Sequence, residues 1–270
     1  MKRTTRISLA GVLVVGVLSG GRRAAQADLN VWSSGGPGGG NIVTIAVDPV
    51  HPMTLYAGAG RFRGGTYTEG SGGIFKSTDG GATWKRTHAG VTNPLVNVVA
   101  IDPHDSTVVY AATDGGVSKS LDAASHWHDT GLTGVVVEAL AVAPATTATL
   151  YAASGGTVFT TTDSGDTWSS AEVHSNSPFD VEILALAADP TTAGTVYAGA
   201  NLGVFKSTDR GATWRETDLE FCAGCSGGPT IDALAIDPEM PAIVYAGGGQ
   251  GFGRTTDGGG DVDLWSGCLS

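Results

Sequence analysis

Short stretches in which apolar and polar residues alternate recur along most of the chain, separated by turns rich in Gly, Asp and Pro. In each recurrence, a first apolar stretch ends in Asp-Pro or Ala-Pro, and a second carries a Tyr followed by Ala. A third stretch, such as Gly203-Val204-Phe205-Lys206-Ser207, leads into an Asp-containing turn, and a Trp begins a fourth. Alternation with a period of two predicts β-strands, and no segment shows sustained helical periodicity. The pattern predicts an all-β protein built from four-stranded antiparallel units.

One motif marks the end of the third strand in each unit: a Ser or Thr, then an Asp, then a Gly-rich turn leading to a Trp. Four regular copies and a stretched fifth recur about every 45 residues, and their Asp and Trp residues are Asp79 and Trp84, Asp122 and Trp127, Asp163 and Trp168, Asp209 and Trp214, and Asp257 and Trp265. Four strands per repeat of this length indicate a β-propeller, in which each repeat forms one blade. We therefore expect a propeller with five recognisable blades.

The residue types of the motif predict how it folds. Its Asp can accept backbone N–H bonds within the turn, and the Gly two positions later takes a positive φ angle without a steric penalty. The Trp is apolar enough to pack between strands and anchor its blade. The second copy has Ala124 where Gly is expected, so we expect strain of about 1 kcal/mol or a different fold there.

These motifs resemble the Asp boxes of BNR-repeat β-propellers, a superfamily that includes sialidases, xyloglucanase-type glycoside hydrolases, sortilin-like receptors and photosystem-assembly propellers. Five motifs in register carry the resemblance, which extends over nearly all of residues 28–270. It implies the fold and not an activity, because members range from hydrolases to binding scaffolds. It also implies that ligands bind on the face opposite the Asp boxes, which we call the loop face.

The repeats divide the chain at about residues 41–90, 91–132, 133–173, 174–220 and 221–270. Residues 28–34, with Trp32, look like an extra outer strand without a blade of its own. Since Trp265 already supplies an outer strand to the fifth repeat, two explanations compete. Either the ring is incomplete, with the blade that Trp32 completes missing, or the fifth copy is degenerate and Trp32 closes a five-bladed ring. We favour the incomplete ring, because propellers of the family that this chain resembles usually have six or more blades.

Residues 1–27 have the composition of a secretory signal peptide. Basic residues precede an apolar stretch from Ile7 to Leu18, and Ala25-Gln26-Ala27 fits a cleavage site. This predicts a secreted or periplasmic protein. The apolar stretch is too short to span a bilayer comfortably. Cleavage would remove basic residues and make the chain more acidic than its formal net charge of −11, which argues against nucleic-acid binding.

In an oxidising compartment Cys222 and Cys225 are close enough in sequence to form a small disulfide, which would leave Cys268 unpaired. No second Cys pair or His pair lies nearby to complete a zinc site. Asp257, Asp261 and Asp263 crowd a Gly-rich turn that could attract Ca²⁺, but no bidentate Glu follows. We therefore expect no metal and no other cofactor.

Candidate ligand-binding residues lie in the longest loop between second and third strands, and they are Arg61, Arg63, Tyr67 and Glu69. Long loops on a rigid scaffold are where function concentrates. The alternative interpretation of this segment is a mobile Gly-rich connection. Residues 174–182 and 221–230 contribute further long connections to the same face.

One turn resembles a catalytic turn. Xyloglucanase-type hydrolases carry a catalytic Asp in a Tyr-Ala-x-Thr-Asp-x-Gly-Gly sequence, and residues 110–116, with Asp114, are similar but lack the residue between Asp and the Gly pair. Glycoside hydrolysis needs two carboxylates that flank the bond, and in that family the second comes from a second propeller, for which we expect no room here. The repeat consensus itself generates such turns, so we interpret Asp114 as a turn residue. A sialidase is not expected, because the early Arg-Ile-Pro signature is absent.

The sequence thus predicts an exported, non-enzymatic propeller that binds a protein or a glycan through its loop face. It predicts no nucleic-acid partner and no membrane span, and it gives no indication of oligomeric state. The alternative is a xyloglucanase-like glycoside hydrolase, or a truncated fragment of one, that uses Asp114.

Overall fold

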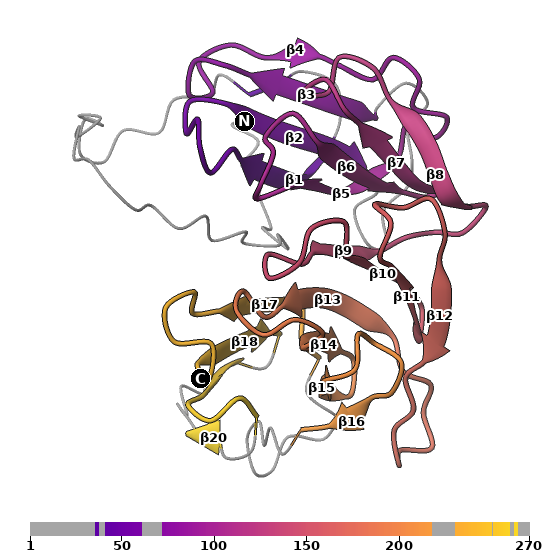
Figure 1. Ribbon diagram of the computed structural model, residues 1–270, viewed down its shortest axis with the longest axis vertical. Helices are drawn as coiled ribbons and strands as arrows, with labels where there is room; N and C mark the ends of the chain where they lie inside the picture. Colours follow the sequence, from indigo (N-terminus) through magenta and orange to yellow (C-terminus); the bar gives the residue numbers. More distant parts are fainter. Residues whose placement is uncertain are drawn as a thin grey trace, which may run out of the picture.

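The computed structural model describes residues 36–37, 41–60, 72–217, 230–249, 251–259 and 262–263. These residues form five four-stranded antiparallel sheets that follow one another along the chain (Figure 1). The expected all-β, five-bladed propeller fold is confirmed. The described part of the chain contains no helix, and hence none long and apolar enough to cross a membrane.

Each blade takes four consecutive strands. Blade 1 contains β1 (Asn41–Val47), β2 (Leu55–Gly60), β3 (Gly73–Ser77) and β4 (Lys85–Arg86). Blade 2 contains β5 (Val96–Ile101), β6 (Val109–Thr113), β7 (Gly116–Ser120) and β8 (His128–Thr133). Blade 3 contains β9 (Ala139–Val142), β10 (Leu150–Ser154), β11 (Thr157–Thr161) and β12 (Ser169–Glu172). Blade 4 contains β13 (Ile183–Ala188), β14 (Val196–Ala200), β15 (Gly203–Ser207) and β16 (Arg215–Glu216). Blade 5 contains β17 (Ala233–Ile236), β18 (Val244–Gly248), β19 (Gly251–Thr255) and β20 (Val262–Asp263).

The first strand of each blade contacts the first strands of its neighbours in the order β1, β5, β9, β13, β17. Within a blade every strand pairs with the next one in sequence, so each blade is a meander. This connectivity alternates two sets of turns. The Asp-containing turns and the connections between first and second strands lie on one face. The turns between second and third strands and the connections between blades build the opposite, loop face.

The core lies between successive blades. We call the side of a blade that packs on the preceding blade its leading face, and the side that packs on the next blade its trailing face. Leading and trailing side chains meet in one buried cluster at each junction, and the pairs are Val99 with Ile74, Leu140 with Val117, Leu186 with Val158, and Leu234 with Val204. Burial of such apolar area contributes about 25 cal/mol per Å², so each blade is stabilised mainly by its neighbours.

Hydrogen bonds across two of the junctions accompany this apolar packing. In blade 1, Tyr56 Oη and Lys76 Nζ both donate to the carbonyl oxygen of Ala123 in blade 2, at 3.3 and 2.9 Å. In blade 4, Tyr197 Oη and Lys206 Nζ donate in the same way to Gly258 of blade 5, at 3.0 and 2.7 Å. In these two blades the Tyr of the second strand therefore reaches the Asp-containing turn of the following blade.

Several sequence predictions concern residues outside the described ranges. They are the signal peptide of residues 1–27, the extra strand of residues 28–34, the loop residues Arg61, Arg63, Tyr67 and Glu69, the cysteines Cys222 and Cys225, and the last Trp, Trp265. These stay predictions.

Candidate functional site

The regular Asp-containing turns hold themselves together with their own polar groups. In the third turn, Thr161 Oγ1 accepts a bond from Gly165 N at 3.0 Å and donates to Asp163 Oδ1 at 2.6 Å. Asp163 also accepts bonds from the backbone N–H and the hydroxyl of Thr167. The first and fourth turns repeat these contacts around Asp79 and Asp209. These carboxylates build the turn, which agrees with the structural role predicted for the motif.

Those hydrogen bonds lower the pKa values of the turn carboxylates. Bonds from Thr83 hold the pKa of Asp79 at about 2, and bonds from Thr161 and Thr167 do the same for Asp163. Donors that favour the charged form lower a carboxyl pKa. A charged, internally bonded carboxylate is a poor general acid near neutral pH, so these turn Asp residues are poorly suited to donate a proton.

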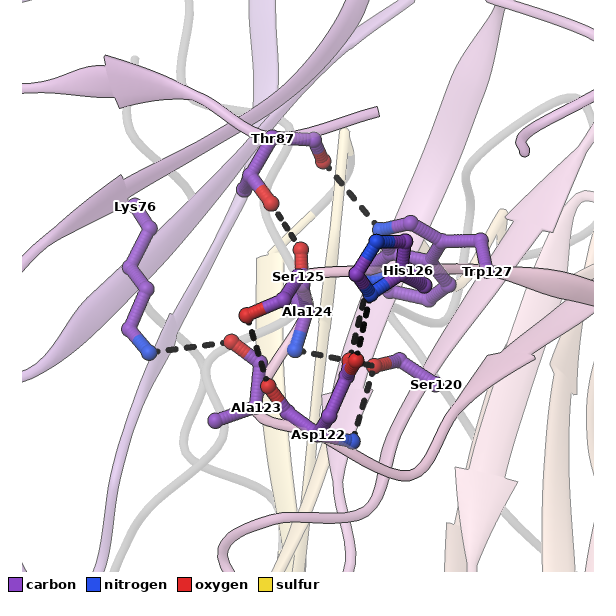
Figure 2. A network of polar contacts seen from close by, with 9 residues as sticks. All are labelled: Lys76, Thr87, Ser120, Asp122, Ala123, Ala124, Ser125, His126 and Trp127. Carbon is purple, nitrogen blue, oxygen red and sulfur yellow. Dashed lines mark hydrogen bonds and ion pairs between the residues drawn. The ribbon is translucent and has the colours of Figure 1, made fainter. Parts of the chain in front are cut away.

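The second turn keeps the backbone shape of the others but has Ala at both positions after its Asp (Figure 2). Ala123 and Ala124 both have positive φ angles, 54° and 68°, the region that non-Gly residues avoid. The indole N–H of Trp127 donates to the carbonyl oxygen of Thr87 in blade 1, at 3.1 Å, and the Thr87 hydroxyl donates to the carbonyl oxygen of Ala124. The turn is therefore built into the junction with blade 1.

Asp114 lies on the loop face, where the sequence placed it, in the turn between β6 and β7. The side chain of Asn97 donates to Asp114 Oδ1 at 2.9 Å and to the carbonyl oxygen of Val137 at 3.0 Å. The Asp114 N–H in turn donates to Leu95 O at 3.1 Å. Through Asn97, the Asp114 turn of blade 2 is thus linked to the connection that leads into blade 3.

Two further acidic side chains on this face were not singled out from the sequence. Glu138 Oε2 accepts a bond from Gly155 N in the turn between β10 and β11, at 3.2 Å. Asp232 precedes the first strand of blade 5 as Glu138 precedes that of blade 3, and its N–H donates to Gly247 O. The signal that marks both is a shared pattern, an apolar residue, an acidic residue, then Ala-Leu, in residues 137–140 and 231–234.

Phe179 is the second feature that sequence reasoning missed. It lies in the connection between β12 and β13 and is 71% exposed, more than any other large apolar side chain in the described residues. Asn201, in the turn between β14 and β15, fixes the connection beside it, because its side chain accepts a bond from Glu182 N at 2.8 Å and donates to Asp180 O at 3.0 Å. An isolated aromatic residue in a Ser-, Asn- and Asp-rich loop was its only sequence signal.

The opposite face carries a polar depression of about 620 Å³. Its lining comes from blades 2, 3 and 4 and includes His104, Thr146, Thr149, Thr162 and Arg210. His104 Nδ1 lies 3.5 Å from Asp102 Oδ1, and Thr162 and Arg210 each adjoin a turn Asp in sequence. Among the described residues no three His, Cys, Asp or Glu side chains are placed to hold a metal ion.

No protein-family model matches the chain. A curated relative, the xyloglucanase Xgh74A of Acetivibrio thermocellus, is 33% identical over 95 residues, which cover 32% of this chain and 11% of that protein. The crystal structure of an ancestral GH74 enzyme matches 86% of this chain and 32% of its own length, with a TM-score of 0.69 at 21% identity. The GH74 xyloglucanase from Xanthomonas campestris matches 81% of this chain and 37% of its own, with a TM-score of 0.60 at 20% identity.

An extracellular domain of a hybrid two-component system from B. thetaiotaomicron also matches, over 79% of this chain and 27% of its own, with a TM-score of 0.59 at 15% identity. At these identities the likeness to the solved structures shows the fold alone. The chain spans about a third of each of these structures. The structures similar to this one thus include both GH74 enzymes and an extracellular domain of a two-component system.

Proposed function

We propose that this propeller is a glycan-binding module that holds a neutral polysaccharide on its loop face, with Phe179 as the stacking platform. The observation that carries the proposal is the exposure of Phe179, 71%, on a connection that Asn201 fixes through two hydrogen bonds. An aromatic ring presents a flat apolar surface at a small cost in conformational entropy. A ring exposed in this way suits the apolar face of a sugar.

The polar groups around Phe179 select the class of sugar. Asp180 and Glu182 follow it in sequence and are exposed, and Asp114, Glu138 and Asp232 lie on the same face of blades 2, 3 and 5. Carboxylates accept hydrogen bonds from sugar hydroxyls, and they repel anionic polymers. The likeness to xyloglucanases supports a neutral β-glucan such as xyloglucan as the ligand.

The test is affinity electrophoresis and calorimetry with xyloglucan, and with polygalacturonate as the anionic comparison. Phe179→Ala should weaken xyloglucan binding about tenfold or more, a loss of about 1.4 kcal/mol. Phe252→Ala is the matched control, because Phe252 is also exposed, 49%, but lies on β19 at the end of the blade series. Equal binding of xyloglucan by wild type and Phe179→Ala, or tighter binding of polygalacturonate, would refute the proposal.

Glycoside hydrolysis is the second candidate, and the junction of blades 2 and 3 favours it. The Asn97 amide donates to Asp114 and to the carbonyl oxygen of Val137, the residue before Glu138, so both acidic residues belong to this junction. Two carboxylates are what this reaction needs. Incubation with xyloglucan and with sialyl-lactose, followed by a reducing-sugar assay, separates the candidates. Release by wild type but not by Asp114→Ala would replace binding with catalysis, provided that Asp105→Ala, on the other face, stays active.

A further inference from the structure

The junction between blades 3 and 4 carries its positive charge in an unusual place. In every blade the Tyr of the second strand pairs in register with one residue of the third strand, and in blades 1 to 5 these residues are Lys76, Lys119, Thr160, Lys206 and Arg254. Blade 3 thus has Thr where the other four have a cation. Blade 4 in turn has Arg210 directly after its turn Asp, where the other turns have Gly, Ala or Ser. The cation at this junction therefore comes from the turn of blade 4.

The hydrogen bonds of this junction differ accordingly. In blades 1 and 4, the Tyr hydroxyl and the Lys ammonium both donate to the carbonyl oxygen of the residue after the next turn Asp. In blade 3, Thr160 Oγ1 donates to the equivalent carbonyl oxygen, that of Arg210, at 3.1 Å, and Tyr151 Oη is buried with no partner among the described residues. Burial raises the pKa of Tyr151 and the charge of Arg210 opposes that rise, so the guanidinium lies near this hydroxyl.

Arg210 lines the polar depression on the face of the Asp-containing turns, and its guanidinium is not paired. Its N–H donates to Gly194 O at 2.9 Å, and its side chain begins over Gly194, where a Cβ would be only 3.1 Å from Arg210 Cγ. Within the described part of the chain Arg210 forms no ion pair, and the neighbouring Asp209 accepts its hydrogen bonds from Ser207 and Thr213 of its own turn. The guanidinium therefore keeps its donors for a ligand.

Threonine hydroxyls line the same depression. Thr146 and Thr149 come from the connection between β9 and β10, and Thr162 comes from the third Asp-containing turn. Thr149 is 4% exposed, and its hydroxyl makes no hydrogen bond to another described residue. Thr146 Oγ1 is likewise buried without a partner among these residues. The depression thus joins an unpaired cation of blade 4 to hydroxyl groups of blade 3 whose hydrogen-bonding capacity the fold leaves unused.

We propose that this depression binds a small tetrahedral oxyanion, the phosphate or sulfate group of a soluble ligand, through the Arg210 guanidinium and the Thr149 and Thr162 hydroxyls. The planar fork of an Arg donates two parallel hydrogen bonds to such a group. A carboxylate has only two oxygens, in one plane, whereas a tetrahedral anion offers further oxygens to hydroxyls that approach from another blade. The site lies opposite the loop face and does not depend on the proposed glycan binding.

The carboxylates around the depression set the expected strength of binding. Asp209 and Asp163 are charged at neutral pH, because hydrogen bonds within their own turns hold their pKa values at about 2. Asp102 lies beside His104, with 3.5 Å between Oδ1 and Nδ1. These charges oppose an anion, so we expect a Kd of about 1 mM for inorganic phosphate. Binding should weaken as salt screens the attraction of Arg210.

Isothermal titration calorimetry with inorganic phosphate and, separately, with inorganic sulfate tests the proposal at low ionic strength. Wild type should bind both anions, and Arg210→Gly should weaken the binding of each about tenfold or more. This variant should fold, because blades 1 and 5 have Gly at the same position of the turn. Thr149→Val, which keeps the shape of the side chain but removes the hydroxyl, should weaken binding about fivefold.

Arg215→Gln is the matched control, because Arg215 is also exposed and lies on β16 of the same blade but does not line the depression. It removes the same charge and should leave the Kd nearly unchanged, and thermal unfolding of each variant checks that it folds. Absence of saturable binding by wild type at millimolar phosphate, or undiminished binding by Arg210→Gly, would overturn the proposal. Equal weakening by Arg215→Gln would also overturn it, since the anion would then respond only to net charge. Acetate bound as tightly as phosphate would contradict the preference for a tetrahedral anion.

Discussion

The second and third Asp-containing turns occupy the same place in successive blades, and a Thr of the preceding blade faces each of them. That residue is Thr87 for the second turn and Thr130 for the third, in equivalent register. In the third turn, the indole N–H of Trp168 donates to Gly165 O of its own turn at 3.0 Å. In the second, the indole of Trp127 donates to the preceding blade instead. Since both turns face a Thr, the Thr does not explain the difference.

The residue that differs is the one two positions after the turn Asp. Gly165 lets the methyl group of Thr130 lie close, since a Cβ on Gly165 would be only 2.9 Å from it. Ala124 fills that space with its own methyl, and the Thr87 hydroxyl takes the Ala124 carbonyl. Trp127 is then 2% exposed, and Trp168 remains only partly buried. The methyl group of Ala124 thus goes together with a change of hydrogen-bond partner. The indole of the third turn bonds within its own turn, whereas the indole of the second turn bonds to the preceding blade.

The largest expected effect follows from the different burial of the two Trp residues. Trp127→Ala should lower the free energy of unfolding by about 3–5 kcal/mol, because it empties a fully buried site between two blades. Trp168→Ala should cost less, since part of that ring is already in solvent. Chemical denaturation followed by circular dichroism measures both. Trp127→Phe, which keeps most of the ring but removes the N–H, should cost about 1 kcal/mol for the hydrogen bond, in addition to the smaller packing loss.

Equal losses for Trp127→Ala and Trp168→Ala would contradict this comparison. Such equal losses would mean that the hydrogen bond from Trp168 to Gly165 stabilises the third turn as much as the contacts with blade 1 stabilise the second turn.

Exchanging Gly and Ala between the turns should have smaller and unequal effects. Gly165→Ala places a Cβ against Thr130 at a φ angle of 100°, so it should destabilise the protein by about 1–2 kcal/mol. Ala124→Gly relieves a φ angle of 68° but removes a methyl group buried completely, worth about 0.8 kcal/mol, so the two changes should nearly cancel. Denaturation midpoints of both variants test the asymmetry.

Ala123→Gly is the control for that pair. Ala123 has a φ angle of 54° but is only partly buried, so the relief of strain should appear as a gain of about 0.5–1 kcal/mol. A loss at this position would show that the left-handed backbone carries no strain in the second turn.

These contrasts also show what the sequence could predict. The spacing of Asp and Trp identified the blades, and the missing Gly identified Ala124 as the position of strain, because both are properties of a local turn. The bond from Trp127 to Thr87 could not be predicted, since it joins residues 40 positions apart in two blades. The Tyr of each second strand was recognised as a repeat feature, but its contact with the next turn depends on how blades pack.

On the loop face, too, some features could be predicted from the sequence and others could not. Asp114 was singled out because the sequence of its turn resembles a catalytic turn, and its bond to Asn97 was not predicted, because Asn97 lies on another strand of the blade. Phe179 was missed because nothing in a sequence states how much of a ring solvent can reach. The sequence therefore predicts the chemistry within a turn, but it does not predict the exposure of a side chain or the contacts between blades.

The smallest predicted effect is a difference in acid sensitivity between the two turns. Hydrogen bonds from Thr161 and Thr167 hold the pKa of Asp163 at about 2, below the ordinary value of 3.8. A folded pKa below the unfolded value contributes stability that is present above about pH 4 and is lost as pH falls through about 2. Asp163→Asn should therefore lower the melting temperature at neutral pH, and its difference from wild type should shrink between about pH 4 and about pH 2.

Asp122 should keep its contribution to lower pH than Asp163. Its pKa is lowered further, first by the backbone N–H of His126 and then by the His126 ring, whose Nδ1 lies 2.7 Å from Asp122 Oδ2. The melting temperatures of Asp122→Asn and wild type should thus stay apart at a pH where those of Asp163→Asn and wild type have nearly converged. His126→Thr, which restores the residue of the regular turns, should bring the acid response of the second turn close to that of the third. If the melting temperatures of both Asn variants converge with that of wild type at the same pH, the His126 ring stabilises the charged form of Asp122 no more than the Thr167 hydroxyl stabilises that of Asp163.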